Sequence, residues 1–563
     1  MLHDFLNVHP SERVSFSHPK LRFMMPTKHP FVFLLALLTV VVAGCSRVQL
    51  SRGTVGGAPG ILRMATGQFD NLNTVLSGGG SSTYLSYLWG AYLFVADDQS
   101  RLHPELAMVI PTIDNGGISR DGLTITYHLR HGVRWQDGRP FDARDVVFTW
   151  RAIMNPKNNV VTRLGYDKVA SMTIVDPYTV HVRLKERFAP AVATLFGPGE
   201  VPMPILPQHL LGSLPDLNHA AYNNKPVGTG PFVIERYDPS SGVTLVANQN
   251  YWRGAPKLRQ IDYMIIPDAN TTMVMLRSNE LDVAFVRGEH TVELARAPGI
   301  RMVREAAAED LYLSLNVTHP PLDDVRVRRA IAMAVDRKFF VQAFQYGTGS
   351  VAETDQPPFL PWADPSVHAP PYDPAQARRL LDEAGWHADQ TGYRSKNGKP
   401  LALTFVYISA REPDTKFAPL FQDAMKNIGI ALEVRSYPYN LFYAQKAQGG
   451  VMALGKYDIA VTGWVWGSDP DESTLWMCDQ RPPQGYNTSF LCDPRIDAAE
   501  RVALTTYDFS GRRAAYWKIQ ELLAQDVPVV FLSWVDTTYA VRDSVTDFRP
   551  GETMWASWNW QKI

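Results

Sequence analysis

Residues 457–472, YDIAVTGWVWGSDPDE, bring aromatic rings and carboxylates together in one short stretch. The stretch begins as a strand, and Gly463 is expected to free the backbone for a turn. Rigid rings supply contact area and charges fix orientation, so this combination is suited to gripping a small ligand. The alternative is a core tryptophan beside a solvated acidic turn. The side chains concerned are Trp464, Trp466, Asp469, Asp471 and Glu472.

The composition is that of an ordinary globular protein. The chain has 563 residues, of which 45% are hydrophobic and 20% charged, so it can form two or more hydrophobic cores. Its 55 Lys and Arg residues nearly balance its 56 Asp and Glu residues. This balance provides no basic field, and we therefore expect neither a nucleic-acid partner nor a polybasic membrane patch.

The N-terminal region resembles a bacterial lipoprotein signal. Lys28 precedes an apolar run at residues 31–42, which is too short to span a bilayer, and small residues then lead to Cys45. We therefore expect residues 1–44 to be a signal peptide, with residues 1–23 a misassigned upstream start. Cys45 would carry the lipid and residues 45–60 would form a flexible tether, so the protein would contact the membrane through its lipid anchor only. A buried apolar helix with a free cysteine is the alternative.

Two cysteines remain after lipidation of Cys45. Cys478 and Cys492 would lie in an oxidising compartment, and we therefore predict a disulfide bond between them. A metal site is the weaker interpretation, because two cysteines without nearby histidines do not complete a tetrahedral ligand set. We predict no cofactor and no metal.

Strands and helices alternate along the chain, which favours α/β lobes. Residues 123–130 alternate in polarity as a half-buried strand does, and residues 83–94 have the composition of an aromatic helix. Asp142 and Asp373 are expected to cap helices. A further helix should begin at Asp324 and place four side chains on one apolar face, namely Val327, Ile331, Val335 and Phe339.

Several longer motifs resemble those of a known family and keep its order. They are YHLRHGVRWQDGRPFDARDVVFTWRAIMNP (127–156), VGTGPF (227–232), NYWRGAPKL (250–258), PLDDVRVRRAIAMAVDR (321–337), YDPAQARRLLDEAGW (372–386) and CDPRID (492–497). Together they resemble the family 5 extracellular solute-binding proteins, which are the peptide, nickel and opine receptors of ABC importers. The similarity covers nearly the whole mature chain.

The resemblance implies an α/β fold of the periplasmic-binding-protein-like class II type, with two lobes and an inserted subdomain in the first lobe. Ligand would be enclosed in the cleft between the lobes by a hinge motion. The chain is expected to cross between lobes near residues 304–316 and 528–533. The expected divisions are lobe I at 61–308, its inserted subdomain at 96–200, lobe II at 309–531 and a return to lobe I at 532–563.

The resemblance also implies a function in transport. We expect a monomeric solute-binding lipoprotein of the periplasm or cell envelope that captures short peptides and delivers them to the transmembrane subunits of an ABC importer. A non-peptide solute such as a sugar, opine or metal chelate is the alternative. The sequence contains no nucleophile elbow, no metalloprotease helix and no P-loop, so we do not expect an enzyme. The other possibilities are an enzyme with a catalytic pair such as Asp469 and Glu472, and a passive envelope lipoprotein.

The similar dipeptide-binding proteins suggest roles for particular residues. Their loop after Gly-Trp carries an aspartate that pairs with the ligand's α-ammonium, whereas Gly467 takes that place in the shorter loop here. Asp469 or Asp471 would substitute if the loop takes another route. Arg411 follows a strand, as the family's carboxylate-binding arginine does, although a surface arginine is the alternative. The cysteine pair also matches a disulfide of those receptors. The expected ligand-binding residues are Trp464, Trp466, Asp469, Asp471 and Arg411.

Overall fold

The computed structural model describes residues 58–563 except 70, 200 and 410, and it leaves the side chains of 307 and 308 undescribed. These residues belong to one compact unit, Val55–Ile563. The expected signal peptide, Cys45 and the tether as far as residue 57 lie outside the described residues. Within the described ranges, no helix combines the length and the apolar character needed to cross a membrane.

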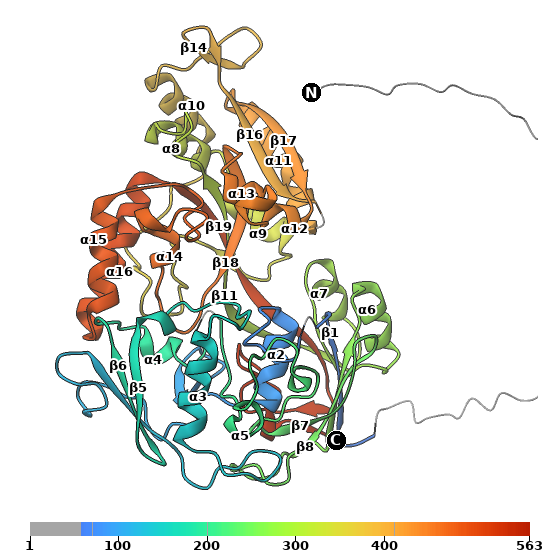
Figure 1. Ribbon diagram of the computed structural model, residues 1–563. Helices are drawn as coiled ribbons and strands as arrows, with labels where there is room; N and C mark the ends of the chain where they lie inside the picture. The colour runs from blue at the N-terminus through green and yellow to red at the C-terminus, as the bar shows by residue number, and fades with distance from the viewer. Residues whose placement is uncertain (1–57, 70, 200, 410) are drawn as a thin grey trace, which may run out of the picture. The chain divides into compact units, whose positions relative to one another are not determined.

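One mixed β-sheet runs through the unit (Figure 1). Its longest strands are β11 (Ile300–Leu315) and β19 (Val529–Arg542), which pair antiparallel in the middle of the strand order. On one side lie β18 (Ile459–Val465), β16 (Ala402–Ile408) and β17 (Ala431–Tyr437); on the other lie β10 (Val283–Phe285), β1 (Ile61–Thr66), β9 (Gln260–Ile265), β8 (Gly242–Ala247) and β7 (Phe232–Asp238). Because β11 pairs with β18 and β19 pairs with β10, these two strands join the two halves of the sheet.

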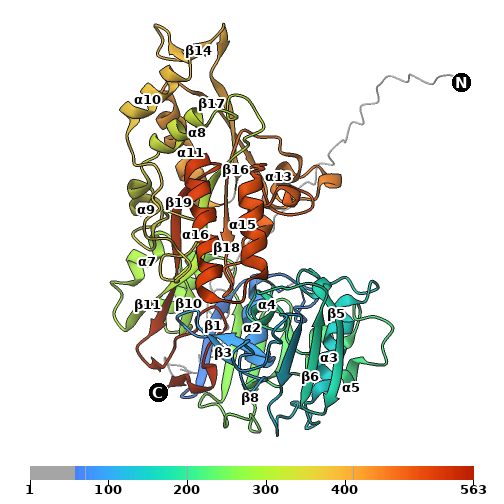
Figure 2. The ribbon, with the colours of Figure 1, turned by 90° about the vertical axis from the view of Figure 1, so that its left-hand side faces the viewer.

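In the β16–β18 half, helices cover both faces of the sheet. The first layer consists of α8 (Val325–Met333), α9 (Arg337–Phe344), α10 (Pro374–Glu383) and α11 (Glu412–Asn427). The second consists of α15 (Pro494–Thr505) and α16 (Phe509–Asp526), which Figure 2 shows in front of β18 and β19. Strand alternation sorts the side chains, since Leu311 and Leu313 of β11 pack with the first layer and Tyr312 packs with the second.

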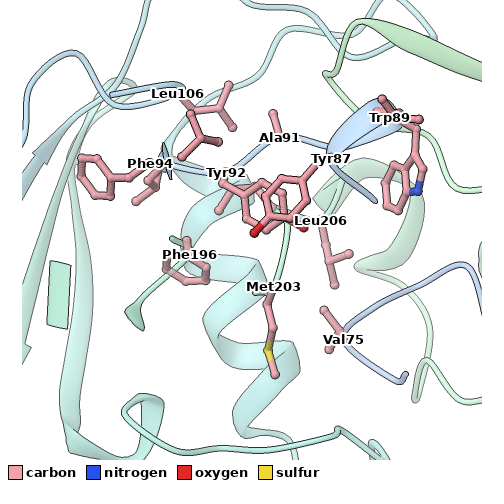
Figure 3. Packing of buried hydrophobic residues seen from close by; sticks show 14 of the residues in the cluster. Val75, Tyr87, Trp89, Ala91, Tyr92, Phe94, Leu106, Phe196, Met203 and Leu206 are labelled. Atoms are coloured by element: carbon pink, nitrogen blue, oxygen red, sulfur yellow. The ribbon is translucent and has the colours of Figure 1, made fainter. Parts of the chain in front are cut away.

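The other half of the sheet packs against a large aromatic core. Helix α2 (Gly80–Trp89) contributes Tyr87 and Trp89 to it, and the chain after the helix contributes Tyr92 and Phe94 (Figure 3). The same core continues into a separate sheet of β4 (Thr124–His128), β5 (Val169–Asp176) and β6 (Thr179–Leu184), which α3 (Ala143–Met154) covers. Helices α6 (Ala269–Arg277) and α7 (Glu289–Leu294) form a smaller cluster with β10.

Two glycines of the VGTGPF motif let the chain approach the end of α2. A Cβ atom on Gly228 would lie 1.9 Å from the carbonyl oxygen of Trp89, and one on Gly230 would lie 2.4 Å from that of Gly90. Only residues without a side chain fit here. The motif therefore serves packing and leads into β7.

Two predicted helix starts are confirmed. The side chain of Asp142 accepts a hydrogen bond from the backbone of Arg144 in a capping box with Asp145 at the start of α3. Asp373 caps α10 and accepts from the backbone of Gln376. Each aspartate satisfies a backbone N–H that the first helical turn leaves without an internal partner.

Two helix predictions need correction. The helix that begins after Asp324 ends at Met333, and Asp336 caps a second helix, α9, so Phe339 is 49% exposed instead of buried. The break occurs because Asp336 accepts a hydrogen bond from the Phe339 backbone and restarts the helical register. The aromatic helix expected at 83–94 is α2, which ends at Trp89, and Phe94 instead begins strand β2 (Phe94–Ala96).

Candidate functional site

Strand β18 continues through Gly463 and ends at Val465, whereas a turn was expected at Gly463. Gly463 pairs with Leu311 of β11, and a Cβ atom on Gly463 would lie 2.2 Å from the carbonyl oxygen of Asp310. The glycine is therefore required by the close approach of two strands, not by a turn. As a result Trp464 lies within the sheet.

The two indoles of this stretch have different environments. Trp464 is half-buried, its backbone N–H donates to Asp310 Oδ1 at 2.8 Å, and its ring centroid lies 5.0 Å from that of Tyr486. Trp466 is only 3% exposed and packs in the core between the sheet and α15 and α16, with Tyr516 among its cluster. Trp464 is thus the indole that retains an accessible surface.

The carboxylate of Asp469 is occupied by the guanidinium of Arg512 in α16. Arg512 donates to both oxygens, with Nη1 to Oδ2 at 2.8 Å and Nη2 to Oδ1 at 2.6 Å. The side chains are 8% exposed for Arg512 and 14% for Asp469. Asp469 Oδ1 also accepts a hydrogen bond from the backbone of Asp471 at 3.0 Å. Such bidentate, charge-assisted pairs are strong, so this ion pair fixes the loop to α16.

Asp471 and Glu472 are also directed into the protein. Asp471 accepts a hydrogen bond from the backbone of Ser473 at the start of α14 (Ser473–Trp476), and burial together with the charge of Asp469 raises its pKa. Glu472 is fully buried and accepts from the Gln356 amide at 3.0 Å. It lies in what we call the buried acid cluster, defined as Asp355, Glu472 and Glu500.

Burial raises the pKa of all three carboxyl groups of the buried acid cluster, and neighbouring carboxylates raise those of Glu472 and Glu500 further. Each group is fully buried, and neither oxygen of Glu500 has a hydrogen-bond partner. Within the described part of the chain, no group of three or more His, Cys, Asp or Glu side chains is arranged to hold a metal ion. Asp469 differs from these three groups because it forms a direct ion pair with Arg512.

Arg411 lies beside β18. It is the N-cap residue of α11, its Nε donates to Asp414 Oδ2 at 2.7 Å, and its Nη2 is 3.5 Å from the carbonyl oxygen of Val461. Its side chain remains 28% exposed. Tyr443, which follows α12 (Tyr439–Phe442), lies close by, with its hydroxyl 2.9 Å from that of Thr462. Arg411 therefore lies beside Val461 of β18, the strand that also carries Trp464.

The end of β18 meets the other half of the sheet at an ion pair. Val465, which is 63% exposed, pairs with Glu309 of β11. Glu309 Oε2 accepts a hydrogen bond at 2.7 Å from Arg287, which follows β10. The Arg287 guanidinium also lies 4.8 Å over the ring of Phe285. Charged and aromatic groups from both halves therefore gather around the exposed end of β18.

The loop that follows Trp466 contacts the region expected to form the inserted subdomain. The backbone and hydroxyl of Ser468 donate to the carbonyl oxygen of Pro198, at 3.3 and 3.2 Å. Farther along, the Tyr507 hydroxyl donates to the carbonyl oxygen of Gly122 at 2.9 Å. These bonds join segments that are distant in sequence at the edge of the candidate site.

Cys478 and Cys492 form a disulfide bond in the structure. The bond closes residues 479–491, the loop that presents Tyr486 to Trp464. Sequence reasoning did not select Tyr486, Tyr443, Arg287 or Glu309 as site residues. The available signal for Tyr486 was its position between two paired cysteines, and for Arg287 its position just after a strand.

Of the expected residues, Trp464 lies in β18 and Arg411 lies beside it at the Val461 carbonyl oxygen, whereas the other three are turned inward. We use the name β18 site for the candidate residues in or near this strand, namely Trp464, Tyr486, Arg411, Arg287 and Glu309. It combines broad aromatic surface with arginines that already have acidic partners. Side chains of these types can contact and orient a small solute.

Comparison with known proteins gives consistent results. The family model for bacterial extracellular solute-binding proteins, family 5, middle region, matches residues 102–485. The chain is 29% identical over 453 residues to Protein XP55 of Streptomyces lividans, covering 80% of this chain and 79% of that protein. It is 29% identical over 468 residues to di/tripeptide-binding protein 1 of Pseudomonas aeruginosa, covering 78% and 83%.

The fold is also similar to solved structures. The crystal structure of NikA from Brucella suis in complex with Fe(III)-EDTA has a TM-score of 0.79 and 24% identity, covering 89% of this chain and 100% of that one. That likeness establishes the periplasmic-binding-protein type of α/β fold. Since the family model spans well over half of the residues, this chain belongs to family 5 of the bacterial extracellular solute-binding proteins.

Proposed function

We propose that this protein captures short peptides at the β18 site and delivers them to the transmembrane subunits of an ABC importer. The observation that carries the proposal is the exposed end of β18, where Val465 pairs with Glu309, the partner of Arg287, and where Arg411 contacts the carbonyl oxygen of Val461 on the same strand. The name of the di/tripeptide-binding relative supports a peptide as the solute. We further propose that the halves joined by β11 and β19 act as lobes that close on the ligand.

The geometry suggests how a peptide would be held. The indole of Trp464 and the ring of Tyr486 offer apolar area for side chains. Arg411 keeps part of its guanidinium accessible beside its bond to Asp414, and a planar fork of this kind suits a carboxylate. Asp469 is already paired with Arg512, so we propose that the loop after Trp466 supports the site instead of binding an α-ammonium.

The proposal is tested by purifying the native protein and identifying the solute that copurifies with it by mass spectrometry. We expect a mixture of short peptides. A single sugar, opine or metal chelate would replace the peptide proposal with its alternative. Turnover of the bound solute would instead point to an enzyme, whereas the proposal is for binding without catalysis.

We also propose that Cys45 carries the lipid anchor that holds the protein at the cell envelope. The support is the order of Lys28, the apolar run at 31–42 and the small residues before Cys45. The variant Cys45→Ala should move the protein from the membrane to the soluble fraction, because more than one acyl chain is needed for stable anchoring. An unchanged membrane fraction would contradict the anchor.

A further inference from the structure

We infer that Tyr486 determines which peptide side chains the β18 site accepts, and that the loop closed by the Cys478–Cys492 bond is the device that positions it. The inference rests on the proposed peptide-binding function and adds a selectivity to it. The favoured ligands would be peptides that place an aromatic or branched aliphatic side chain beside Trp464.

The position of the Tyr486 ring supports this role. Its centroid lies 5.0 Å from that of Trp464, with the planes tilted by 56°. Tyr486 is 55% exposed although its neighbour Trp464 is half-buried. Two rings at this angle are tilted instead of stacked, and we propose that an apolar side chain of the ligand contacts both. Tyrosine and tryptophan are enriched among the residues that carry binding energy, which fits a ligand contact for this pair.

The loop holds Tyr486 in place through its neighbours. The backbone N–H of Tyr486 donates to the carbonyl oxygen of Thr474 at 2.9 Å. The next residue, Asn487, is fully buried, and its amide donates to three backbone carbonyl oxygens, those of Trp476, Met477 and Leu491. These bonds hold the backbone at Tyr486 and Asn487 and so restrict where the Tyr486 ring can lie.

Two further connections tie the loop to the sheet and to α15. The carbonyl oxygen of Thr488 accepts a hydrogen bond from the Tyr457 hydroxyl at 2.7 Å. The side-chain hydroxyl of Thr488 lies 2.9 Å from that of Ser314 in β11. At the base of the loop, the backbone of Cys478 donates to Asp497 Oδ1 at 2.9 Å, and the disulfide joins Cys478 to Cys492. Opening the disulfide removes the covalent closure of the segment that carries Tyr486.

Calorimetry with two peptide sets tests the inference, one set with Phe or Leu side chains and one with Gly and Ala only. For Tyr486→Ala we expect about a tenfold loss of affinity for the first set, as for removal of one buried aromatic contact, and less than about a twofold change for the second. Tyr486→Phe should restore the selectivity, because the ring makes the contact. The control Tyr372→Ala, at a tyrosine that is 54% exposed on the outer surface of the helical layer, should change neither set.

The double variant Cys478→Ser/Cys492→Ser tests the positioning role of the loop. We expect the same selective loss for the first peptide set, smaller than in Tyr486→Ala, with the near-ultraviolet circular dichroism of the core retained. Unaltered selectivity in the double variant would overturn the role of the disulfide, and an equal loss for both sets in Tyr486→Ala would overturn the role of the ring. If the wild-type protein binds no peptide of either set, the proposed function fails and this inference fails with it.

Discussion

Trp464 and Trp466 lie two residues apart in the sequence, yet they have opposite surroundings. Trp464 keeps an accessible face beside Tyr486, whereas Trp466 is 3% exposed within the core. The residues after Trp466 follow it inward, since Asp469 pairs with Arg512 and Glu472 is fully buried. The two indoles therefore differ in accessibility, and we propose that Trp464 faces the ligand while Trp466 belongs to the framework behind it.

The partners that decide this division lie far away in the sequence. Arg512 is 43 residues from Asp469 in the sequence. Arg411 contacts Val461 of β18, which lies 50 residues farther along the chain. A carboxylate placed beside an aromatic ring looks suited to a ligand, but a buried arginine takes its charge. The comparison teaches that a charged side chain of this stretch belongs to the framework when a buried partner takes its charge, as Arg512 does for Asp469.

The largest expected effect comes from the framework. The variant Asp469→Asn removes the bidentate carboxylate partner of the buried Arg512, and breaking a buried ion pair in this way typically costs about 3–5 kcal/mol of the free energy of unfolding. Urea denaturation measures this loss. The matched control Glu521→Gln removes an exposed partner of Lys518, with side chains 51% exposed on both sides, and should change the stability by less than about 1 kcal/mol.

A stable Asp469→Asn protein with greatly weakened ligand binding would break the comparison. It would mean that Asp469 contacts the ligand directly and that the framework does not depend on its charge.

The two tryptophans should separate stability from affinity. Trp466→Ala removes a buried side chain and is expected to cost about 3–5 kcal/mol of the free energy of unfolding. Trp464→Ala should cost less than half of that and should reduce ligand affinity about tenfold, because its exposed face would be the one that meets ligand. Denaturation and calorimetry on both variants measure the two effects. Equal losses of stability would contradict the assignment of Trp464 to the ligand face.

A smaller effect concerns the buried acid cluster and its pH dependence. The pKa of Glu500 is raised by burial and by the charge of Asp471, so the folded state keeps a proton that the unfolded chain loses above about pH 4. This group therefore makes the protein less stable as the pH rises from about 4 towards the raised pKa. Replacing Glu500 removes two buried oxygens without partners.

For Glu500→Met we expect a gain of about 1–3 kcal/mol in the free energy of unfolding at pH 8, and a smaller gain at pH 5. Denaturation at the two pH values measures the difference. A loss of stability at both values would show that the Glu500 carboxylate has a stabilising partner and would remove the contrast with Asp469.

Much of the fold followed from local sequence signals. The caps at Asp142 and Asp373 were predictable because a helix start needs an acceptor for its free N–H groups, and the ordered motifs indicated the family. The exposure of Phe339 was not predictable from periodicity, because Val335 and Phe339 are spaced as on one helix face. Asp336 lies between them and starts a new helix. Competing local signals of this kind are resolved only by packing.

The candidate site was less predictable than the fold. Arg411 follows a strand as expected, whereas Trp464 lies within β18, where the sequence had predicted a turn at Gly463. Tyr486 was not selected because its relation to Trp464 depends on the tertiary course of the loop closed by the disulfide. The ion pair between Asp469 and Arg512 was not predictable for the same reason, since no residue near Asp469 in the sequence indicates Arg512.

Calorimetry on matched free and N-acetylated peptides tests the central claim, that this protein binds peptides without an acidic partner for the α-ammonium. Because Asp469 is paired with Arg512 and Asp471 is turned towards Ser473, blocking the amine should change the affinity by less than about threefold. Arg411→Ala should weaken both peptides equally. A preference for the free amine of about tenfold to a hundredfold, which corresponds to a charge-assisted bond of about 1.5–3 kcal/mol, would contradict the account.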